Sequence, residues 1–515
     1  MMKRLFVYVL ALAGLCPAVA QVPAAWGDQG NGTYVNPILN ADYSDPDVIR
    51  VGEKYYMVCS DFHYIGMPVL ESDDMVNWTI ISQVYDRFDY PKWDSNGRFA
   101  GGSWAPAIRY HDGKFWIFFC TPHEGLFMTT ADDPHGPWAP LHQVVAVEKW
   151  EDPCPFWDED GQAYLGRSQH GAGPIIIHRM SPDGRRLLDT GVTVYTGPVA
   201  EGTKIHKRDG YYYISIPEGS VPTGWQTILR SRNIYGPYEK KVVLEQGSTA
   251  INGPHQGALV DTPEGEWWFY HFQFVEPIGR VVHLQPAHWK EGWPVIGVDM
   301  DMNGIGEPVT VWTKPNTGKS LPASRPQAGD DFSAPTLGLQ WQYNHNPVPE
   351  AVSLTARAGW LRLHALKADC LKMSRNMLTQ KVMGYHSEAT TRMDVSRLAD
   401  GQRAGLLCGG NLFNGIGVLR EGGKNYVYLE KDGEIERLKT LGSKTVYLRA
   451  VIDYPANEHR LLYSTDGKNF VPAGEPYSLK FGSWKGTRVG LYSYNTVDAA
   501  GAADFDYFTY IVDGK

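Results

Sequence analysis

Five copies of one short pattern between residues 51 and 270 constrain the fold of this chain more than any other feature. In each copy a glycine turn, most often Asp-Gly, precedes a dense run of aromatic and β-branched residues. The copies are Val51–Val58, Asp112–Phe118, Asp160–Leu165, Asp209–Ile214 and Glu264–Tyr270. Asp-Gly at such a place favours a β-hairpin, because a type I′ turn needs positive φ at both central residues. A hairpin roughly every 50 residues is the spacing of propeller blades. The sequence therefore predicts a five-bladed β-propeller, with a β-sandwich of repeated hairpins as the alternative.

One polar or aromatic residue lies a short distance upstream of each of these turns. These residues are Asp45, Trp104, Asp152, Glu201 and His255. The first strand of each propeller blade lines the central channel, so equivalent positions should converge at one end of it. Carboxylates brought together in this way perturb one another's pKa values, which is typical of acid–base sites. Each residue alone has an ordinary explanation, such as a turn cap or a core histidine, but their equivalent placement predicts a functional site.

Short motifs surround these residues and recur in a fixed order along the chain. They are Asn36-Pro37-Ile38-Leu39 with Tyr43-Ser44-Asp45-Pro46-Asp47, then Trp104-Ala105-Pro106, Glu151-Asp152-Pro153, Glu201-Gly202-Thr203-Lys204, Gly253-Pro254-His255-Gln256-Gly257 and Gly279-Arg280. In order and spacing they resemble glycoside hydrolase family 43 over residues 34–312. One departure is Thr203-Lys204, where many members of the family have Pro-His. We expect this departure to affect contacts with the leaving group.

The resemblance implies an inverting hydrolase in which three carboxylates divide the chemistry. Asp45 would be the general base, Glu201 the general acid, and Asp152 the residue that orients the acid and tunes its pKa. Inverting enzymes hold the two catalytic carboxyl groups roughly 6.5–9.5 Å apart, which leaves room for the attacking water. Because the acid must carry a proton when substrate binds, we expect the neighbouring Asp152 and partial burial to raise the pKa of Glu201.

The resemblance also suggests which residues bind the sugar or an ion. Arg280 would reach the sugar near the two catalytic carboxylates. His255 resembles the histidine near a structural ion, usually calcium, in the propeller channel, and would act through water because calcium prefers oxygen ligands. Trp104 and Phe62 are candidate stacking faces for the sugar, with core packing an equal alternative for Phe62. No organic cofactor is expected.

The chain changes character after residue 312. Residues 313–329 are rich in Pro, Ser, Gly and Ala and are predicted to be a linker. Residues 330–515 contain many short alternating strands without a convincing helix, which favours an antiparallel sandwich. The segments Asp330–Ser333 and Leu337–Pro347 resemble the concanavalin-like sandwich appended to many family-43 xylosidases and arabinofuranosidases. The predicted fold is all-β, with the propeller at 34–312 followed by this sandwich, which the resemblance implies can help close the sugar pocket.

The N-terminus has the organisation of a secretory signal peptide over residues 1–20. Lys3 and Arg4 precede the apolar run Leu5–Leu15, and Ala18-Val19-Ala20 supplies small residues for cleavage. The apolar run is too short to span a membrane. We therefore expect an exported protein, periplasmic or extracellular, with lipid modification of Cys16 as a minor alternative. A net charge of −9 argues against nucleic acid and anionic membranes as partners.

Together these features predict an exo-acting inverting hydrolase that releases terminal β-D-xylosyl or α-L-arabinofuranosyl residues from plant hemicellulose or its oligosaccharides. The alternatives are an endo-acting arabinanase, and a carbohydrate-binding protein on the same scaffold that has lost catalysis. The presence of all three carboxylates in their motifs favours an enzyme. The appended sandwich favours a pocket over the open groove of an endo-acting enzyme. The sequence leaves open which pentose is preferred and whether the protein forms oligomers.

Overall fold

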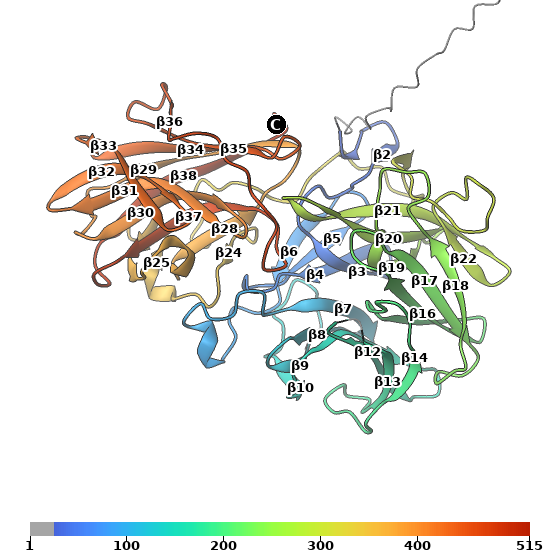
Figure 1. The fold of residues 1–515 in the computed structure, drawn as a ribbon. Coiled ribbons are helices and arrows are strands. Elements are labelled where there is room, and N and C mark those ends of the chain that lie inside the picture. The colour runs from blue at the N-terminus through green and yellow to red at the C-terminus, as the bar shows by residue number, and fades with distance from the viewer. Residues whose placement is uncertain (1–24, 172, 515) are drawn as a thin grey trace, which may run out of the picture.

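The computed structural model describes residues 25–171 and 173–514, so the predicted signal peptide lies outside the described residues. The described chain is all-β, with two sets of sheets and only three short 3-10 turns (Figure 1). The turns are η1 (Pro91–Trp93), η2 (Pro349–Ala351) and η3 (Leu371–Met373). Of the helices in this part of the chain, none has the length and apolar character needed to cross a membrane.

Five antiparallel sheets of four strands each form the N-terminal half. They are β3 (Ser44–Val51), β4 (Lys54–Ser60), β5 (Pro68–Ser72) and β6 (Thr79–Gln83); β7 (Trp104–His111), β8 (Lys114–Thr121), β9 (Gly125–Ala131) and β10 (His142–Val145); β11 (Trp150–Trp157), β12 (Ala163–Gln169), β13 (Ile175–Met180) and β14 (Val192–Tyr195); β15 (Lys204–Arg208), β16 (Tyr211–Glu218), β17 (Trp225–Ser231) and β18 (Glu239–Leu244); β19 (His255–Asp261), β20 (Trp267–Val275), β21 (Gly279–Lys290) and β22 (Trp293–Ile296). Each predicted hairpin joins the first and second strands of one sheet. Asp112-Gly113 and Asp209-Gly210 have positive φ at both residues, as a type I′ turn requires.

The five sheets are arranged as a closed ring. The first strand β3 packs against β7 on one side and against β19 on the other, and β11 packs against both β7 and β15. The ring is closed by β19, which also packs against β16 of the fourth sheet. Apolar clusters fill the spaces between neighbouring sheets; one of them contains Val58, Ile108 and Phe119. The first strands therefore surround a central channel, and the four-stranded sheets are consistent with the five predicted blades. A small sheet of β1 (Gly27–Asp28), β2 (Thr33–Val35) and β23 (Val311–Thr313) joins the two ends of this half of the chain.

Two further sheets form the predicted sandwich. One contains β24 (Gln342–Tyr343), β28 (Met377–Lys381), β37 (Arg488–Asn495), β30 (Gln402–Gly409), β31 (Phe413–Glu421), β32 (Lys424–Lys431) and β33 (Glu434–Leu441), with β27 (Leu366–Lys367) beside β37; the other contains β25 (Val352–Ser353), β26 (Leu361–His364), β38 (Ala502–Val512), β29 (His386–Asp394), β34 (Thr445–Asp453), β35 (Glu458–Ser464) and β36 (Val471–Pro472). Burial alternates from residue to residue along β29 and β34, as expected where one face of a sheet covers a core. The prediction of an all-β chain that ends in a sandwich is confirmed.

The sandwich packs against the propeller through apolar contacts, and ion pairs bind the segment between the two domains to the propeller. A single apolar cluster contains Tyr43 and Val282 of the propeller together with Leu378 and Met383 of the sandwich. Within the stretch predicted as a linker, Lys314 forms ion pairs with Asp28 at 2.5 Å and Asp74 at 2.7 Å, which fasten this segment to the propeller. These contacts hold the sandwich in place beside the start of the propeller.

Candidate active site

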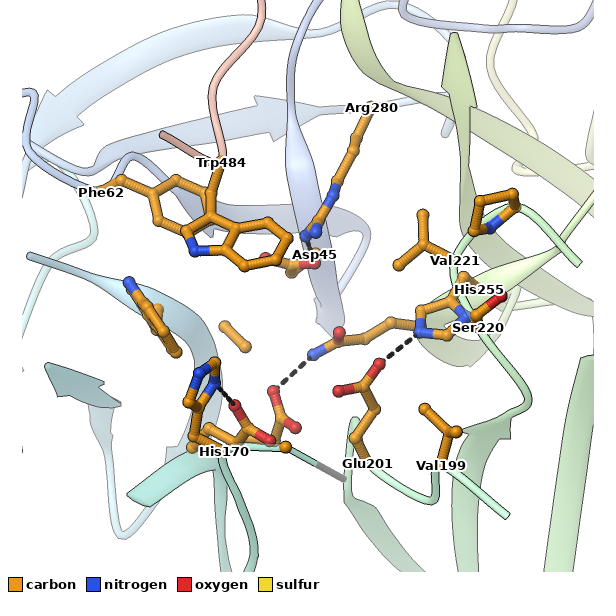
Figure 2. A pocket seen from close by; sticks show the side chains of 17 residues that line it. Asp45, Phe62, His170, Val199, Glu201, Ser220, Val221, His255, Arg280 and Trp484 are labelled. Atoms are coloured by element: carbon orange, nitrogen blue, oxygen red, sulfur yellow. Dashed lines mark hydrogen bonds and ion pairs between the residues drawn. The ribbon is translucent and has the colours of Figure 1, made fainter. Parts of the chain in front are cut away.

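A pocket of about 480 Å³ lies at the end of the channel where the first strands β3, β7, β11 and β19 begin. Its wall contains all of the residues predicted for the site (Figure 2): Asp45, Phe62, Trp104, Asp152, Glu201, His255 and Arg280. The structure thus brings together side chains that are separated by more than 200 positions in the sequence. Glu151, His170, Gln256 and Trp484 also line the pocket and were not predicted.

An irregularity of the first strands positions these side chains. The strand pairing shifts next to the pocket in four of the five sheets. At these shifts Asp45, Ala105, Asp152 and Gln256 have positive φ values of 55°, 36°, 55° and 41°. Such a conformation costs on the order of 1–3 kcal/mol for a residue other than glycine, and is found mostly where function requires it. In the remaining sheet Gly202 occupies the corresponding place, with φ of 64°.

These shifts in strand pairing are β-bulges. Because of them, the predicted residues do not all occupy the same position in their repeats, contrary to expectation. Asp45 and Asp152 occupy the left-handed position itself. Trp104, Glu201 and His255 each stand one residue before it, because Ala105, Gly202 and Gln256 are the left-handed residues of their sheets. A bulge breaks the strict alternation of side chains along a strand. Two consecutive residues can therefore face the pocket, and this is why Glu151 lines it beside Asp152.

Asp45 is buried and held through both of its carboxylate oxygens. Ser60 Oγ donates a hydrogen bond to Asp45 Oδ2 at 2.6 Å. Arg280 Nη1 donates to Asp45 Oδ1 at 2.6 Å, and the Asp45 side chain is only 5% exposed. Arg280 therefore reaches the predicted base directly in this structure. The two bonds fix the orientation of the carboxylate, as a group that must aim at one water molecule requires.

Asp152 connects the strands on the opposite side of the pocket. Its Oδ2 accepts hydrogen bonds from Ser168 Oγ at 2.6 Å and from the backbone N–H of Gly202 at 2.7 Å. Its Oδ1 accepts a third from Gln256 Nε2 at 3.1 Å. The bond to Gly202 fixes the backbone immediately after Glu201. Burial and the charge of Glu201 raise the pKa of Asp152 to about 6, so the two carboxylates influence each other's ionisation.

Glu151 is a third carboxyl group in the same cluster. Oxygen atoms of Glu151, Asp152 and Glu201 all lie within 4.8 Å of one another. Burial, and then the charges of Asp152 and Glu201, raise the pKa of Glu151 to about 10. Glu151 therefore keeps its proton at neutral pH, and its contact with His170 at 3.4 Å is not an ion pair there. A neutral Glu151 limits the negative charge that this crowded cluster must accommodate.

Glu201 faces the pocket and is bound to His255. His255 Nε2 lies 2.7 Å from Glu201 Oε1 (Figure 2). Burial alone would raise the pKa of Glu201. The hydrogen bond and charge of His255, together with the charges of Arg280 and His170, have a larger opposite effect, so the pKa of Glu201 is lowered overall. The expectation of a raised pKa is therefore wrong for this structure. Burial and Asp152 are apparent from the sequence, whereas the bond to His255 depends on how two sheets meet.

Lys204 does not line the pocket, and neither does Thr203, so the departure at Thr203-Lys204 has no direct contact there. The side chain of Lys204 is buried, and its Nζ donates to the backbone oxygen of Pro106 at 3.2 Å. The same atom lies 3.7 Å from Asp47 Oδ1, and Arg109 Nη1 lies 2.7 Å from Asp47 Oδ2. Lys204 and Arg109 thus place two cations next to the single carboxylate of Asp47, deeper in the channel.

Aromatic side chains form the wall opposite Glu201. Phe62 and Trp104 have ring centroids 6.1 Å apart, and Trp484 lies 6.5 Å from Trp104. Trp484 belongs to the sandwich, in the loop before β37, and is 42% exposed. Among the described residues of the sandwich, it is the one that lines the pocket. The only sequence signal for it is a tryptophan in the turn-like segment Gly482–Gly486, and such a segment does not indicate which surface it meets.

Comparisons with known proteins agree with this geometry. The family model "Glycosyl hydrolases family 43" matches residues 34–294, and the model "Beta xylosidase C-terminal Concanavalin A-like domain" matches residues 329–511. A putative beta-xylosidase of Xylanibacter ruminicola is 60% identical over 90% of this chain and 87% of its own length. A non-reducing end alpha-L-arabinofuranosidase of Bacteroides ovatus is 27% identical, over 93% of this chain and 94% of its own. The crystal structure of a GH43 protein from Bacillus licheniformis superposes with a TM-score of 0.81 at 28% identity, covering 93% of this chain and 100% of that one.

Proposed function

Because this chain belongs to glycoside hydrolase family 43, we propose that it removes single β-D-xylosyl or α-L-arabinofuranosyl residues from the ends of hemicellulose chains or oligosaccharides. The observation that carries the proposal is the pocket itself. It holds Asp45, Asp152 and Glu201 together, and Trp484 of the sandwich forms part of its wall. A pocket suits the terminal sugar of a chain, whereas an endo-acting enzyme needs a groove that is open at both ends.

The residues of the pocket can divide an inverting displacement between them. Glu201 would protonate the departing oxygen while Asp45 takes a proton from a water that attacks the opposite face of the sugar. Asp152 would hold Glu201 in place through the N–H of Gly202. Glu201 must gain a proton for this role. The nearby charge of Asp152 and the exclusion of water by the bound sugar both favour its protonated form, against the bond from His255.

A structural calcium ion and export remain proposals. His255 Nδ1 is buried without a hydrogen-bond partner in the described part of the chain, so it fits a water molecule held by an ion. The ion would support the wall of the channel and take no part in bond cleavage. Export rests on the sequence of residues 1–20 alone.

Removal of the ion tests the calcium proposal. We expect extended chelation to lower the Tm before it changes the pH profile of hydrolysis, because the ion would stabilise the channel and not the transition state. Elemental analysis of active, dialysed protein gives the direct answer. Active, dialysed protein that contains no calcium, or a Tm that chelation leaves unchanged, would contradict the proposal.

The proposed function is tested with aryl β-D-xyloside and aryl α-L-arabinofuranoside, followed by xylo- and arabino-oligosaccharides. We expect one of the two aryl glycosides to be cleaved and the oligosaccharides to lose single pentoses from one end. Release of arabino-oligosaccharides from arabinan without free pentose would identify an endo-acting arabinanase. Binding to these sugars without any hydrolysis would identify a carbohydrate-binding protein.

A further inference from the structure

The sandwich loop that carries Trp484 is fitted tightly against the propeller. Ser483 and Trp484 have positive φ values of 52° and 61°. A Cβ atom on Gly486 would lie 1.7 Å from the backbone oxygen of Ile278, so only glycine allows this approach. The N–H of Gly486 donates to Asp42 Oδ2 at 3.0 Å. The loop therefore has a defined binding position on the propeller, immediately beside the pocket.

Lys485 lies at the centre of this contact between the loop and the propeller, and is 2% exposed. Its Nζ is 2.7 Å from Asp42 Oδ2, 3.5 Å from Asp61 Oδ1 and 3.2 Å from the backbone oxygen of Ser60. Two other sandwich cations contact Asp61 Oδ1: Lys381 at 2.5 Å and Arg488 at 3.4 Å. The sandwich thus places three cations on two buried carboxylates of the propeller. Among the three, Lys485 alone is ion-paired with Asp42.

The partners of Lys485 are the groups that support Asp45. Asp42 Oδ1 accepts a hydrogen bond from the N–H of Arg280 at 3.0 Å, and Arg280 holds Asp45 Oδ1. Ser60, whose backbone oxygen accepts from Lys485, holds Asp45 Oδ2 through its hydroxyl. Lys485 therefore contacts one donor to Asp45 directly, Ser60, and contacts Asp42, which holds the other donor, Arg280. The same ammonium also lies 5.4 Å from the ring of Phe62, another wall of the pocket.

We propose that Lys485 is a positioning residue that fixes Arg280 and Ser60, and through them Asp45, from the side of the sandwich. Docking of the sandwich then contributes to the geometry of the predicted base as well as to the pocket wall. The inference rests on the proposed function, because it assigns Lys485 a part in that reaction. Lys381 provides the contrast: it is a buried sandwich cation of the same cluster, but its contact is with Asp61 and not with Asp42 or Ser60.

The test compares Lys485→Met with Lys381→Met in the full chain, on the aryl glycoside that the wild type cleaves. Both variants remove one buried cation, so both should lower the Tm. We expect Lys485→Met to lower kcat by about 10- to 100-fold with a smaller change in KM, since displacement of a reacting group by about 1 Å has effects of this size. Lys381→Met should leave kcat much closer to that of wild type, because Lys381 contacts neither Asp42 nor Ser60. Lys485→Arg, which retains the charge, should recover part of the loss.

A crystal structure of Lys485→Met provides a readout that does not depend on the substrate. We expect the contact between Arg280 Nη1 and Asp45, 2.6 Å in the wild type, to be broken or lengthened. An unchanged contact, or an equal loss of kcat in Lys381→Met, would overturn the inference. If Lys485→Met does not fold, Asp42→Asn weakens the same link and is judged by the same two measurements. An inactive wild-type protein would instead refute the proposed function and leave the structural comparison valid.

Discussion

Replacing Glu201 by alanine is expected to abolish most activity on a natural xylosyl or arabinosyl linkage, while sparing much of it on an aryl glycoside with an acidic phenol. A general acid matters in proportion to how poor the leaving group is, because a good leaving group departs without protonation. The contribution of such a group is typically about 100- to 10,000-fold. The loss in kcat/KM should therefore grow steadily with the pKa of the leaving group across a series of aryl glycosides.

His255→Ala is the matched comparison for this experiment. It removes the 2.7 Å bond to Glu201 Oε1 but leaves the carboxyl group in the pocket. Because His255 lowers the pKa of Glu201, its removal should raise that pKa and extend the protonated form to higher pH. The descending limb of the pH–rate profile should then move to higher pH. Equal losses for Glu201→Ala on good and poor leaving groups would show that Glu201 is not the acid.

Replacing Asp45 by asparagine is expected to remove activity on every substrate, whatever the leaving group. Water must be activated in each case, and an amide cannot accept its proton, so the loss should again reach about 100- to 10,000-fold. Asparagine has nearly the same shape as aspartate, but it leaves the buried Arg280 without its anionic partner, so a lower Tm is expected for a variant that still folds. Kinetics on one good and one poor leaving group, with Tm as the control for folding, separate this result from that of Glu201→Ala. A leaving-group dependence for Asp45→Asn would contradict the assignment of Asp45 as base.

Much of the fold could be predicted because its signals are local. Asp112-Gly113 and Asp209-Gly210 determine a type I′ turn through their own backbone preferences, and the strands on either side follow. The repeat of that signal along the chain predicts the sheets, and with them the convergence of Asp45, Asp152 and Glu201. What a repeat cannot show is the exact side-chain register beside a bulge. For this reason Glu151 was missed, although it adjoins Asp152 in the sequence.

The remaining features depend on contacts between distant parts of the chain. Trp484 reaches the pocket only because the sandwich packs against the propeller, and no local pattern around it indicates that contact. The pKa of Glu201 likewise depends on residues elsewhere in the chain: the hydrogen bond and charge of His255, together with the charges of Arg280 and His170, outweigh the burial that was foreseen. Lys204 departs from the family motif in the sequence, yet in the structure its ammonium contacts Asp47 and the backbone oxygen of Pro106 and does not line the pocket.

Proton NMR of the first sugar released tests most directly whether Asp45 and Glu201 carry out a single displacement across this pocket. The spectrum is recorded at once after enzyme is added to an aryl glycoside, before the free sugar mutarotates. The proposed mechanism predicts that the first anomer has the configuration opposite to that of the substrate, because water attacks the face remote from the leaving group. A first product with the configuration of the substrate would mean that the reaction passes through a covalent intermediate, and would contradict the role of Asp45 as a base.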